Sequence, residues 1–356
     1  MIFFRGVKVR SYNEYSILKI FIYQLTCKPL MKVYRDINNL PPFVNAAITI
    51  GTFDGVHSGH LQIINQLKKE AERNQGESVI ITFDPHPRMV LNAQKNQQPI
   101  KLLNSLSEKI ELLEKQKIDH LVIVPFTLDF SNQSAEKYIA DFLISKFHPA
   151  TIIIGYDHHF GKGRTGDYKL LEKNQQKFNY RVEEIPEQVL DHVTISSTKI
   201  RQALKEADIH TANECLSYEY FFEGKIIEGN KLGRTMGYPT ANLEIPDPNK
   251  LIPADGIYAV VVFLRNETKI SNSGTFHKGM MSIGFRPTIG DNKKMIEINI
   301  FDFNENIYGK TVRVYVKYFL RNEEKFNSME DLKKQIALDE IESKKLLEDV
   351  NFPVNK

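Results

Sequence analysis

The sequence predicts an α/β fold class in two parts: a parallel sheet with helices on both faces, then a small antiparallel β-barrel with a C-terminal helix. Up to about residue 204, short apolar runs alternate with amphipathic helical segments, which indicates crossovers between parallel strands. After about residue 215, strand-like runs are separated by glycine, asparagine and proline turns. We therefore expect a boundary near residues 205–217, with domains at residues 31–210 and 215–350.

The first part shows strands and helices in alternation. In one helical segment, Leu61, Ile64 and Leu67 lie at the spacing of a single helical face. Ser134 is the expected N-cap of a later helix. We expect strands at residues 46–51, 78–84, 120–126 and 151–157, and helices at residues 60–74, 106–118 and 134–147.

The second part consists of strand segments rich in β-branched and aromatic residues, followed by one helix. The helix has Ser328 as its N-cap and the carboxylate of Asp331 three residues later. The strands are expected at residues 221–229, 256–265, 279–285, 294–303 and 311–320, and the helix at residues 328–350.

The composition is that of an ordinary globular protein, with 42% hydrophobic and 26% charged residues among 356. Because 47 basic and 44 acidic residues leave a net charge of only +3, binding to long nucleic acid is not implied, whereas a small anionic ligand is compatible. Cys27 and Cys215 form neither a disulfide framework nor a CxxC metal site, and we assign them no role. This cysteine usage indicates a reduced, cytoplasmic protein.

Residues 1–30 could pass for a signal sequence, because a basic start precedes the run ILKIFIYQL. Lys19 interrupts that run, which is too short to span a bilayer, and no cleavage-site pattern follows. We expect no membrane segment. Residues 1–30 are interpreted as an N-terminal extension, which a start codon placed too far upstream would explain.

The stretch GTFDGVHSGH, residues 51–60, follows the first strand of the parallel sheet and begins a helix. Open α/β sheets bind ligands at this end of their strands, and the N–H groups at a helix N-terminus favour an anion. Glycines at positions 51, 55 and 59 allow close backbone approach, so His57 and His60 would face phosphate. A metal site or an incidental turn remains an alternative, although HxxH lacks the spacing and glutamate of HExxH.

Other nucleotide-binding and hydrolytic devices do not occur. No GxGxxG follows the first strand, and GYDHHFGKGRTG, residues 155–166, has five residues between its first two glycines where a P-loop requires four. No GxSxG elbow of a serine hydrolase is present.

The motif ISSTKIRQAL, residues 195–204, offers hydroxyls on Ser196, Ser197 and Thr198, with Arg201 one turn later. This set suits a triphosphate, and an ordinary helix cap is the alternative.

In this order, TIGTFDGVHSGH, FDPHP (83–87), GYDHHFGKGRTGD (155–167) and ISSTKIR resemble the adenylyltransferase half of the bacterial bifunctional riboflavin kinase/FAD synthetase family. The later motifs GNKLGRTMGYPTANLE (229–244), DGIYAV (255–260), SIGFRPTIG (282–290) and EINIFDFNENIYGK (297–310) resemble its kinase module. The resemblance covers about residues 31 to 345. It implies a Rossmann-like HxGH nucleotidyltransferase domain followed by a riboflavin kinase-like barrel.

The resemblance implies two reactions. Riboflavin and ATP give FMN, and FMN and a second ATP then give FAD and pyrophosphate, with Mg²⁺ as the metal cofactor. The expected partners are the small molecules riboflavin, FMN and ATP, with no nucleic acid and no membrane. The sequence does not predict the oligomeric state.

For the adenylyltransferase half, the resemblance implies that His57 and His60 stabilise charge on the α-phosphate and the departing pyrophosphate. His158 and His159 depart from the aromatic and arginine pair more usual after GYD. The expected nucleotide and phosphate contacts are Gly51, Phe53, Asp54, Gly55, Ser197, Thr198 and Arg201, and the expected flavin contacts are Phe83, Pro85 and Asp157.

For the kinase half, the resemblance makes Glu297 the base that accepts the riboflavin proton, and Thr240 and Asn242 the Mg²⁺ ligands. Many relatives have histidine where this chain has Asn299. The loop residues Gly233, Arg234 and Gly237 are expected to fold over the nucleotide phosphates.

Two rival hypotheses belong to other functional classes. One is a single-activity nucleotidyltransferase with a flavin-sensing barrel, which the intact Glu297 argues against. The other is a non-enzymatic nucleic-acid binding protein, which the near-neutral charge argues against.

Overall fold

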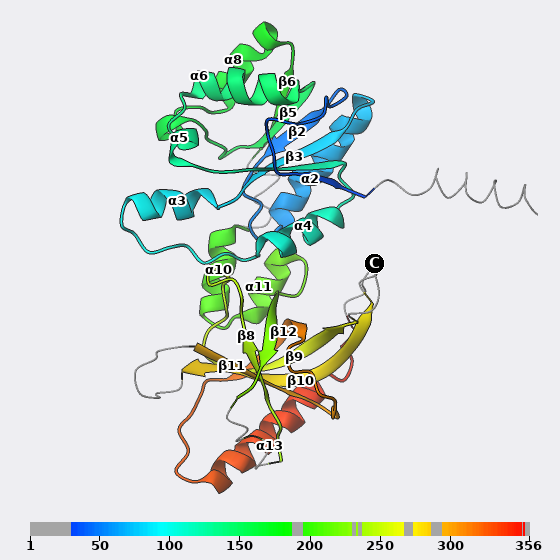
Figure 1. Cartoon of the computed structure of the whole chain (residues 1–356), viewed down its shortest axis with the longest axis vertical. Helices are drawn as coiled ribbons and strands as arrows, with labels where there is room; N and C mark the ends of the chain where they lie inside the picture. The colour runs from blue at the N-terminus through cyan, green and yellow to red at the C-terminus, as the bar shows by residue number, and fades with distance from the viewer. Residues whose placement is uncertain are drawn as a thin grey trace, which may run out of the picture.

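The computed structural model describes residues 30–186, 195–229, 233, 237–266, 273–285, 294–350 and 352. Figure 1 shows two lobes stacked along the long axis, with the parallel sheet in one and the barrel in the other. Most of the N-terminal extension and Arg234 lie outside the described residues. In the part of the chain that is described, no helix is both long and apolar enough to cross a bilayer.

The first lobe is built on a parallel sheet with the strand order β1-β4-β3-β2-β5-β6. The chain runs outward from β2 through β3 to β4 and then returns to place β5 on the other side of β2. The order therefore reverses at β2, where a doubly wound sheet opens a crevice for ligands. The strands are β1 (Lys32–Tyr34), β2 (Ala47–Ile50), β3 (Ser78–Phe83), β4 (His120–Val124), β5 (Thr151–Gly155) and β6 (Arg181–Ile185).

Helices cover both faces of this sheet. Successive strand residues point to opposite sides, so the apolar strands present side chains to the helices on each face. Ala47 packs on one face with α2 and α4, and Ile48 packs on the other with the helical segment at 135–147 and α8. Ser134 caps that segment as expected, but residues Tyr138–Ile144 wind as a π-helix. The helices are α2 (Ser58–Arg73), α3 (Pro87–Gln94), α4 (Leu106–Glu114), α5 (Leu128–Ser131), α6 (Ala135–Lys137), η1 (Tyr138–Ile144), α7 (Ser145–Phe147), η2 (Lys162–Arg164) and α8 (Tyr168–Phe178).

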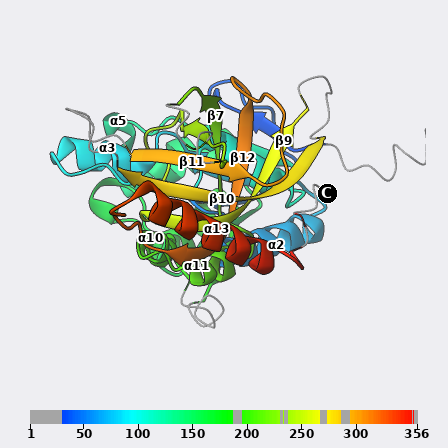
Figure 2. The same ribbon diagram turned by 90° about the horizontal axis from the view of Figure 1, so that it is seen from below.

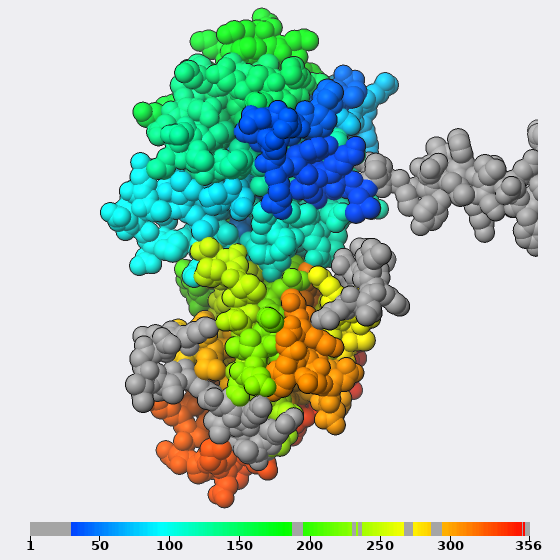
Figure 3. Space-filling model, in the orientation of Figure 1, coloured from blue at the N-terminus to red at the C-terminus, as the bar shows by residue number. Residues whose placement is uncertain are grey.

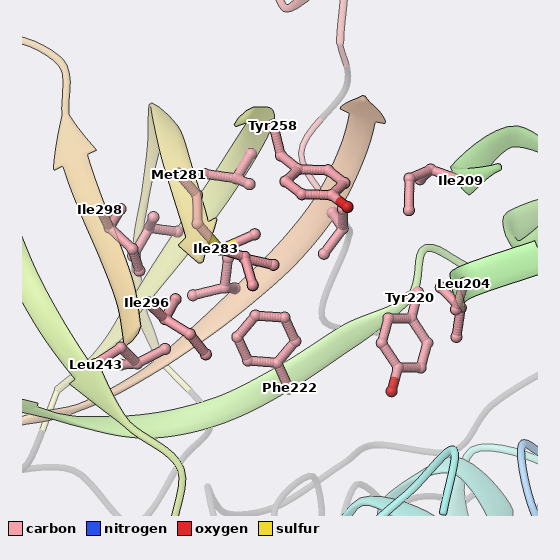
Figure 4. Packing of buried hydrophobic residues seen from close by; sticks show 14 of the residues in the cluster. Leu204, Ile209, Tyr220, Phe222, Leu243, Tyr258, Met281, Ile283, Ile296 and Ile298 are labelled. Atoms are coloured by element: carbon pink, nitrogen blue, oxygen red, sulfur yellow. The ribbon is translucent and has the colours of Figure 1, made fainter. Parts of the chain in front are cut away.

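The second lobe is a closed antiparallel barrel with the strand order β10-β11-β8-β7-β12-β9. Figure 4 shows its interior, where Phe222, Met281 and Ile298 meet. The strands are β7 (Phe221–Ile227), β8 (Ala241–Glu244), β9 (Gly256–Arg265), β10 (Gly274–Phe285), β11 (Lys294–Ile300) and β12 (Thr311–Arg321). The α/β fold with a following barrel is confirmed.

Three further helices are found among residues 195–229 and 294–350 of the described chain. α10 (Ser197–Lys205) and α11 (Ile209–Leu216) lie between the lobes in Figure 1, and their apolar side chains join the barrel core. α13 (Met329–Leu346) is capped by Ser328 as expected and lies across the outside of the barrel, as Figure 2 shows from below. The lobes are also joined by ion pairs, such as Arg313 of β12 with Glu111 of α4, whose Nη1 and Oε1 atoms lie 2.8 Å apart.

Candidate active sites

The loop between β2 and α2 turns sharply before the helix begins. Gly55 has φ +91°, and Phe53 and the β-branched Val56 have φ of 47° and 38°, which side-chain-bearing residues rarely adopt. His57 is the N-cap of α2, but its side chain makes no capping hydrogen bond. A Cβ at Gly59 would lie 3.3 Å from the His57 ring. The loop therefore presents the His57 ring at the tip of α2 in place of a capping group.

His57 and His60 stack on each other, with ring centroids 3.7 Å apart and an interplanar angle of 19°. The Nδ1 atoms of both rings are buried and have no hydrogen-bond partner. Burial, with a smaller contribution from Arg201, lowers the pKa of His57 to about 4, and burial also lowers the pKa of His60 well below its usual range. Both imidazoles are therefore neutral at pH 7, with buried polar atoms that a ligand could satisfy.

Asp54 connects this loop to α10. Its carboxylate is buried, accepts hydrogen bonds from the backbone N–H groups of Leu103 and Asn104, and forms an ion pair with Arg201. Ser197 donates its hydroxyl to the Asp54 carbonyl at 2.9 Å. The structure thus brings three of the expected phosphate contacts together, although the Arg201 guanidinium is already bonded to Asp54. Thr198 is exposed on the first turn of α10, and Gly51 follows β2.

The expected flavin contacts lie at the ends of β3 and β5, the neighbours of β2 on either side: Phe83 ends β3, and Pro85 and Asp157 lie just beyond the two strands. Phe83 is only 8% exposed and packs in an aromatic cluster, with ring centroids 5.5 Å from Phe126 and 5.7 Å from Phe130. Pro85 and Asp157 are exposed at the same edge of the sheet. The flavin contacts of Pro85 and Asp157 therefore stay a prediction. Phe83 is part of the hydrophobic core.

His158, next to Asp157, has a buried Nε2 without a hydrogen-bond partner. Burial lowers the pKa of its ring to about 4. His159 is exposed beside it.

Two residues near the histidine loop were not among the site residues expected from the sequence. Lys109 of α4 is buried and donates to the Thr52 carbonyl at 2.8 Å, and its charge helps lower the pKa of His60. His86, the N-cap of α3, is also buried, and burial together with Lys109 and Arg201 lowers its pKa to about 3. His86 could have been selected as a site residue because it lies in the motif FDPHP. The burial of Lys109 could not be predicted, because a lysine in a helical segment is normally expected at the surface.

In the barrel, antiparallel pairing sets Asn242 of β8 opposite Glu297 of β11. Asn242 is buried and its Oδ1 has no hydrogen-bond partner, while Thr240 precedes it by two residues at the start of the strand. Asn299 donates its side-chain amide to the Pro239 carbonyl at 2.8 Å. Asn299 therefore holds the turn that carries Thr240.

The loop before β8 folds back on these residues. Gly233 accepts a backbone hydrogen bond from Tyr238 at 2.8 Å, and a Cβ at Gly233 would lie 3.1 Å from the Thr240 hydroxyl. A Cβ at Gly229 would overlap the Asn242 amide. Gly237 is exposed, with φ +88°. This tight packing fixes the direction of the Asn242 side chain.

A cleft lies between the barrel and α13. Its volume is about 590 Å³, and Phe276 and Phe301 are among its walls. Phe301 immediately follows β11, two residues after Asn299. Glu323 accepts the hydroxyl of Ser282 at 3.3 Å, and Ser282 pairs with Glu297 across β10 and β11. Burial, with smaller contributions from Asp255 and Glu297, raises the pKa of Glu323.

The two domains are those of a class of enzyme in which a nucleotidyltransferase domain is joined to a small-molecule kinase barrel. The family model of FAD synthetase matches residues 42–199, and that of riboflavin kinase matches residues 216–347. The chain belongs to the bifunctional riboflavin kinase/FMN adenylyltransferase family. The sequence-based family assignment is confirmed.

Relatives with that name match the chain over almost their whole length. The Haemophilus influenzae protein is 36% identical over 87% of this chain and 97% of its own. The Buchnera aphidicola protein is 37% identical over 87% of this chain and 96% of its own. A crystal structure from Streptococcus pneumoniae, described as a macrolide-efflux protein, has a TM-score of 0.76 at 28% identity and covers 89% of this chain and 99% of that one.

The buried His57 ring predicts a stability that falls in acid. Between pH 6.5 and about 4 the unfolded chain binds a proton at this ring that the folded chain does not, so the free energy of unfolding falls as the pH is lowered. At pH 5 this one group costs roughly 2 kcal/mol. In urea unfolding followed by circular dichroism, His57→Gln should lose less stability than the original chain between pH 7 and 5. His210→Gln, at a side chain that is 83% exposed, is the control; equal losses in all three proteins would contradict the burial argument.

Proposed function

We propose that this chain makes FMN from riboflavin and ATP in its barrel, residues 215–350, and FAD from FMN and a second ATP in its α/β domain, residues 31–210. The observation that carries the proposal is that each domain holds its own buried, unpartnered polar atoms at the family's motif positions. These atoms are the imidazole Nδ1 atoms of His57 and His60 in one domain and the amide Oδ1 of Asn242 in the other. Two separate donor and acceptor sets fit two successive reactions of ATP.

In adenylyl transfer, a phosphate oxygen of FMN attacks the α-phosphorus of ATP. The new P–O bond forms as the bond to the β-phosphate breaks, and pyrophosphate leaves. The nucleophile is already an anion, so no general base is required. His57 and His60, at the N-terminus of α2, supply N–H donors to the charge that develops on the phosphates. Nearby phosphate charge raises the imidazole pKa values, so bound nucleotide favours the protonated, better-donating form.

Other groups in this domain position the nucleotide. Ser197 and Thr198 lie on the first turn of α10, where the free N–H groups also favour phosphate. Arg201, held by Asp54, contributes positive charge near the histidines, and the backbone at Gly51, Phe53 and Gly55 shapes the loop. The isoalloxazine ring is proposed to lie along the exposed edge formed by Pro85 and Asp157, with Phe83 behind it.

In the kinase reaction, the terminal ribityl hydroxyl of riboflavin attacks the γ-phosphorus of ATP. The O–P bond forms, the bond to the β-phosphate breaks, ADP leaves, and the Glu297 carboxylate accepts the hydroxyl proton. The cleft walled by Phe276 and Phe301 is proposed to take the flavin ring, because aromatic side chains can stack on it. The loop from Gly233 through Arg234 to Gly237 is proposed to cover the phosphates.

The donor set at β8 fits Mg²⁺. Hydroxyl and amide oxygens are hard ligands, and the buried Asn242 Oδ1 has no hydrogen-bond partner. Thr240 and Asn242 would hold the ion, which would neutralise phosphate charge when bound with ATP. Asn299 keeps Thr240 in place by its bond to the Pro239 carbonyl.

Substitutions should separate the two activities, because the reacting groups lie on different domains. His57→Ala should lower FAD formation from FMN at least about 100-fold through loss of phosphate stabilisation, while FMN formation from riboflavin is retained. Glu297→Gln should do the reverse. Chromatography of flavin products, with FMN or riboflavin supplied separately, measures both rates. Loss of both activities in either variant would contradict the assignment of the sites.

Loss of the Asn242 oxygen should weaken use of the metal in the kinase step alone. Asn242→Ala should raise the Mg²⁺ concentration that gives half-maximal FMN formation by about tenfold or more. The Mg²⁺ dependence of FAD formation in the same protein is the internal control. An unchanged Mg²⁺ requirement for FMN formation would remove Asn242 from the metal site.

A further inference from the structure

The barrel half inserts one lysine into the junction with the α/β domain. Lys250 precedes β9 and is only 4% exposed. Its ammonium group donates to the carbonyl of Leu103 and to the carboxylate of Glu108, both at 2.6 Å, and to the carbonyl of Phe221 at 2.8 Å. An ammonium group has three N–H donors, so all three are used, two of them across the domain boundary.

Backbone contacts reinforce this junction. The Leu102 N–H donates to the Asn249 carbonyl at 2.7 Å, and the Leu251 N–H donates to the Leu102 carbonyl at 2.8 Å. In Figure 3 the chain around residue 250, in yellow-green, lies against the upper lobe at the waist of the molecule. The 101–109 segment of the α/β domain is therefore clamped by the 249–251 loop of the barrel half.

The 101–109 segment in turn holds Asp54 of the loop between β2 and α2 and Arg201 of α10. The N–H groups of Leu103 and Asn104 bind Asp54 at 3.0 and 3.3 Å, and the Lys101 carbonyl accepts from Nε of Arg201 at 2.8 Å. Lys109, directly after the Glu108 that Lys250 binds, donates to the carbonyl of Thr52. Asp54 lies only three residues before His57, so a shift of this segment moves the histidine loop.

We propose that Lys250, although part of the barrel half, is a positioning residue of the adenylyl-transfer site. Among the described residues, its ammonium group bonds to Leu103, Glu108 and Phe221, none of which is assigned to the chemistry. Instead it fixes the segment that holds Asp54, Arg201 and Lys109, and through them the histidine loop. The proposal rests on the adenylyl-transfer function proposed above.

The test is Lys250→Met in the full-length chain, assayed with FMN and ATP for FAD formation and with riboflavin and ATP for FMN formation. Because misplacement of reacting groups by about 1 Å costs about 100-fold, we expect kcat for FAD formation to fall about 10- to 100-fold. FMN formation on the same polypeptide should be retained, which shows that the barrel is folded. An equal fall in both rates, or an unchanged rate of FAD formation, overturns the proposal.

A matched control distinguishes an effect of Lys250 on the position of the 101–109 segment from a general loss of protein stability. Arg321→Met also removes a cation from an ion pair with a buried barrel carboxylate, that of Asp339, which is 4% exposed, but Arg321 does not touch the 101–109 segment. Its rate of FAD formation should be unchanged at a comparable loss of melting temperature. A fall like that of Lys250→Met would show a general stability effect and overturn the proposal.

A double variant removes the unpaired buried charge that the single change leaves. In Lys250→Met with Glu108→Gln, melting temperature should recover, because a neutral amide replaces the carboxylate. FAD formation should stay low, because the Leu103 carbonyl is still not held. Full recovery of FAD formation would overturn the proposal. If the unchanged chain itself makes FMN but no FAD, the proposed function fails, and that outcome is distinct from every variant result.

Discussion

The buried ion pair between Asp54 and Arg201 is the interaction on which the adenylyl-transfer site depends. It ties the histidine loop after β2 to the first turns of α10, and the N–H groups of Leu103 and Asn104 satisfy the other carboxylate oxygen. A buried pair of this kind contributes little net stability compared with apolar packing, but breaking it leaves a costly unpaired charge. Its value here is geometric, because two loops from distant parts of the chain are held in one arrangement.

This geometry places neutral imidazoles among fixed positive charges. Burial lowers the pKa values of the site histidines, and nearby cations lower them further: Arg201 for His57, Lys109 for His60 and both for His86. Two cations, a helix N-terminus and unpartnered ring nitrogens are thus gathered at this loop, where Asp54 balances the charge of Arg201. Under the proposed function a polyphosphate binds here, and such local groups would hold an anion without a large net positive charge on the chain.

The central strands and the helices over them could be predicted because β2 to β5 are apolar runs buried on both faces. The barrel could be predicted because glycine, asparagine and proline turns separate its strand segments. β1 and β6 were missed because they lie at the sheet edges, where β6 carries Arg181, Glu183 and Glu184 and reads as surface. β8 was missed because it has only four residues, ANLE, and exists through its pairing with β7 and β11.

The motif residues of the site could be predicted by resemblance, but their partners could not. Asp54 and Arg201 are 147 positions apart, and Asp54 and Leu103 are 49 apart, so no local pattern connects them. Lys109 and Lys250 were missed for a related reason. Lysine is usually a surface residue, and only the folded chain shows that both of these are buried beside acceptors.

The central claim, that the neutral imidazoles at the tip of α2 face nucleotide phosphate, is tested most directly by nuclear magnetic resonance of the histidine side chains. The imidazole resonances would be titrated with acid in the presence and absence of a non-hydrolysable ATP analogue, and His57 assigned by its loss in a substituted variant. The account predicts that the analogue raises the pKa of His57 from its ligand-free value of about 4. An imidazole whose resonances and pKa do not respond to saturating analogue would contradict it.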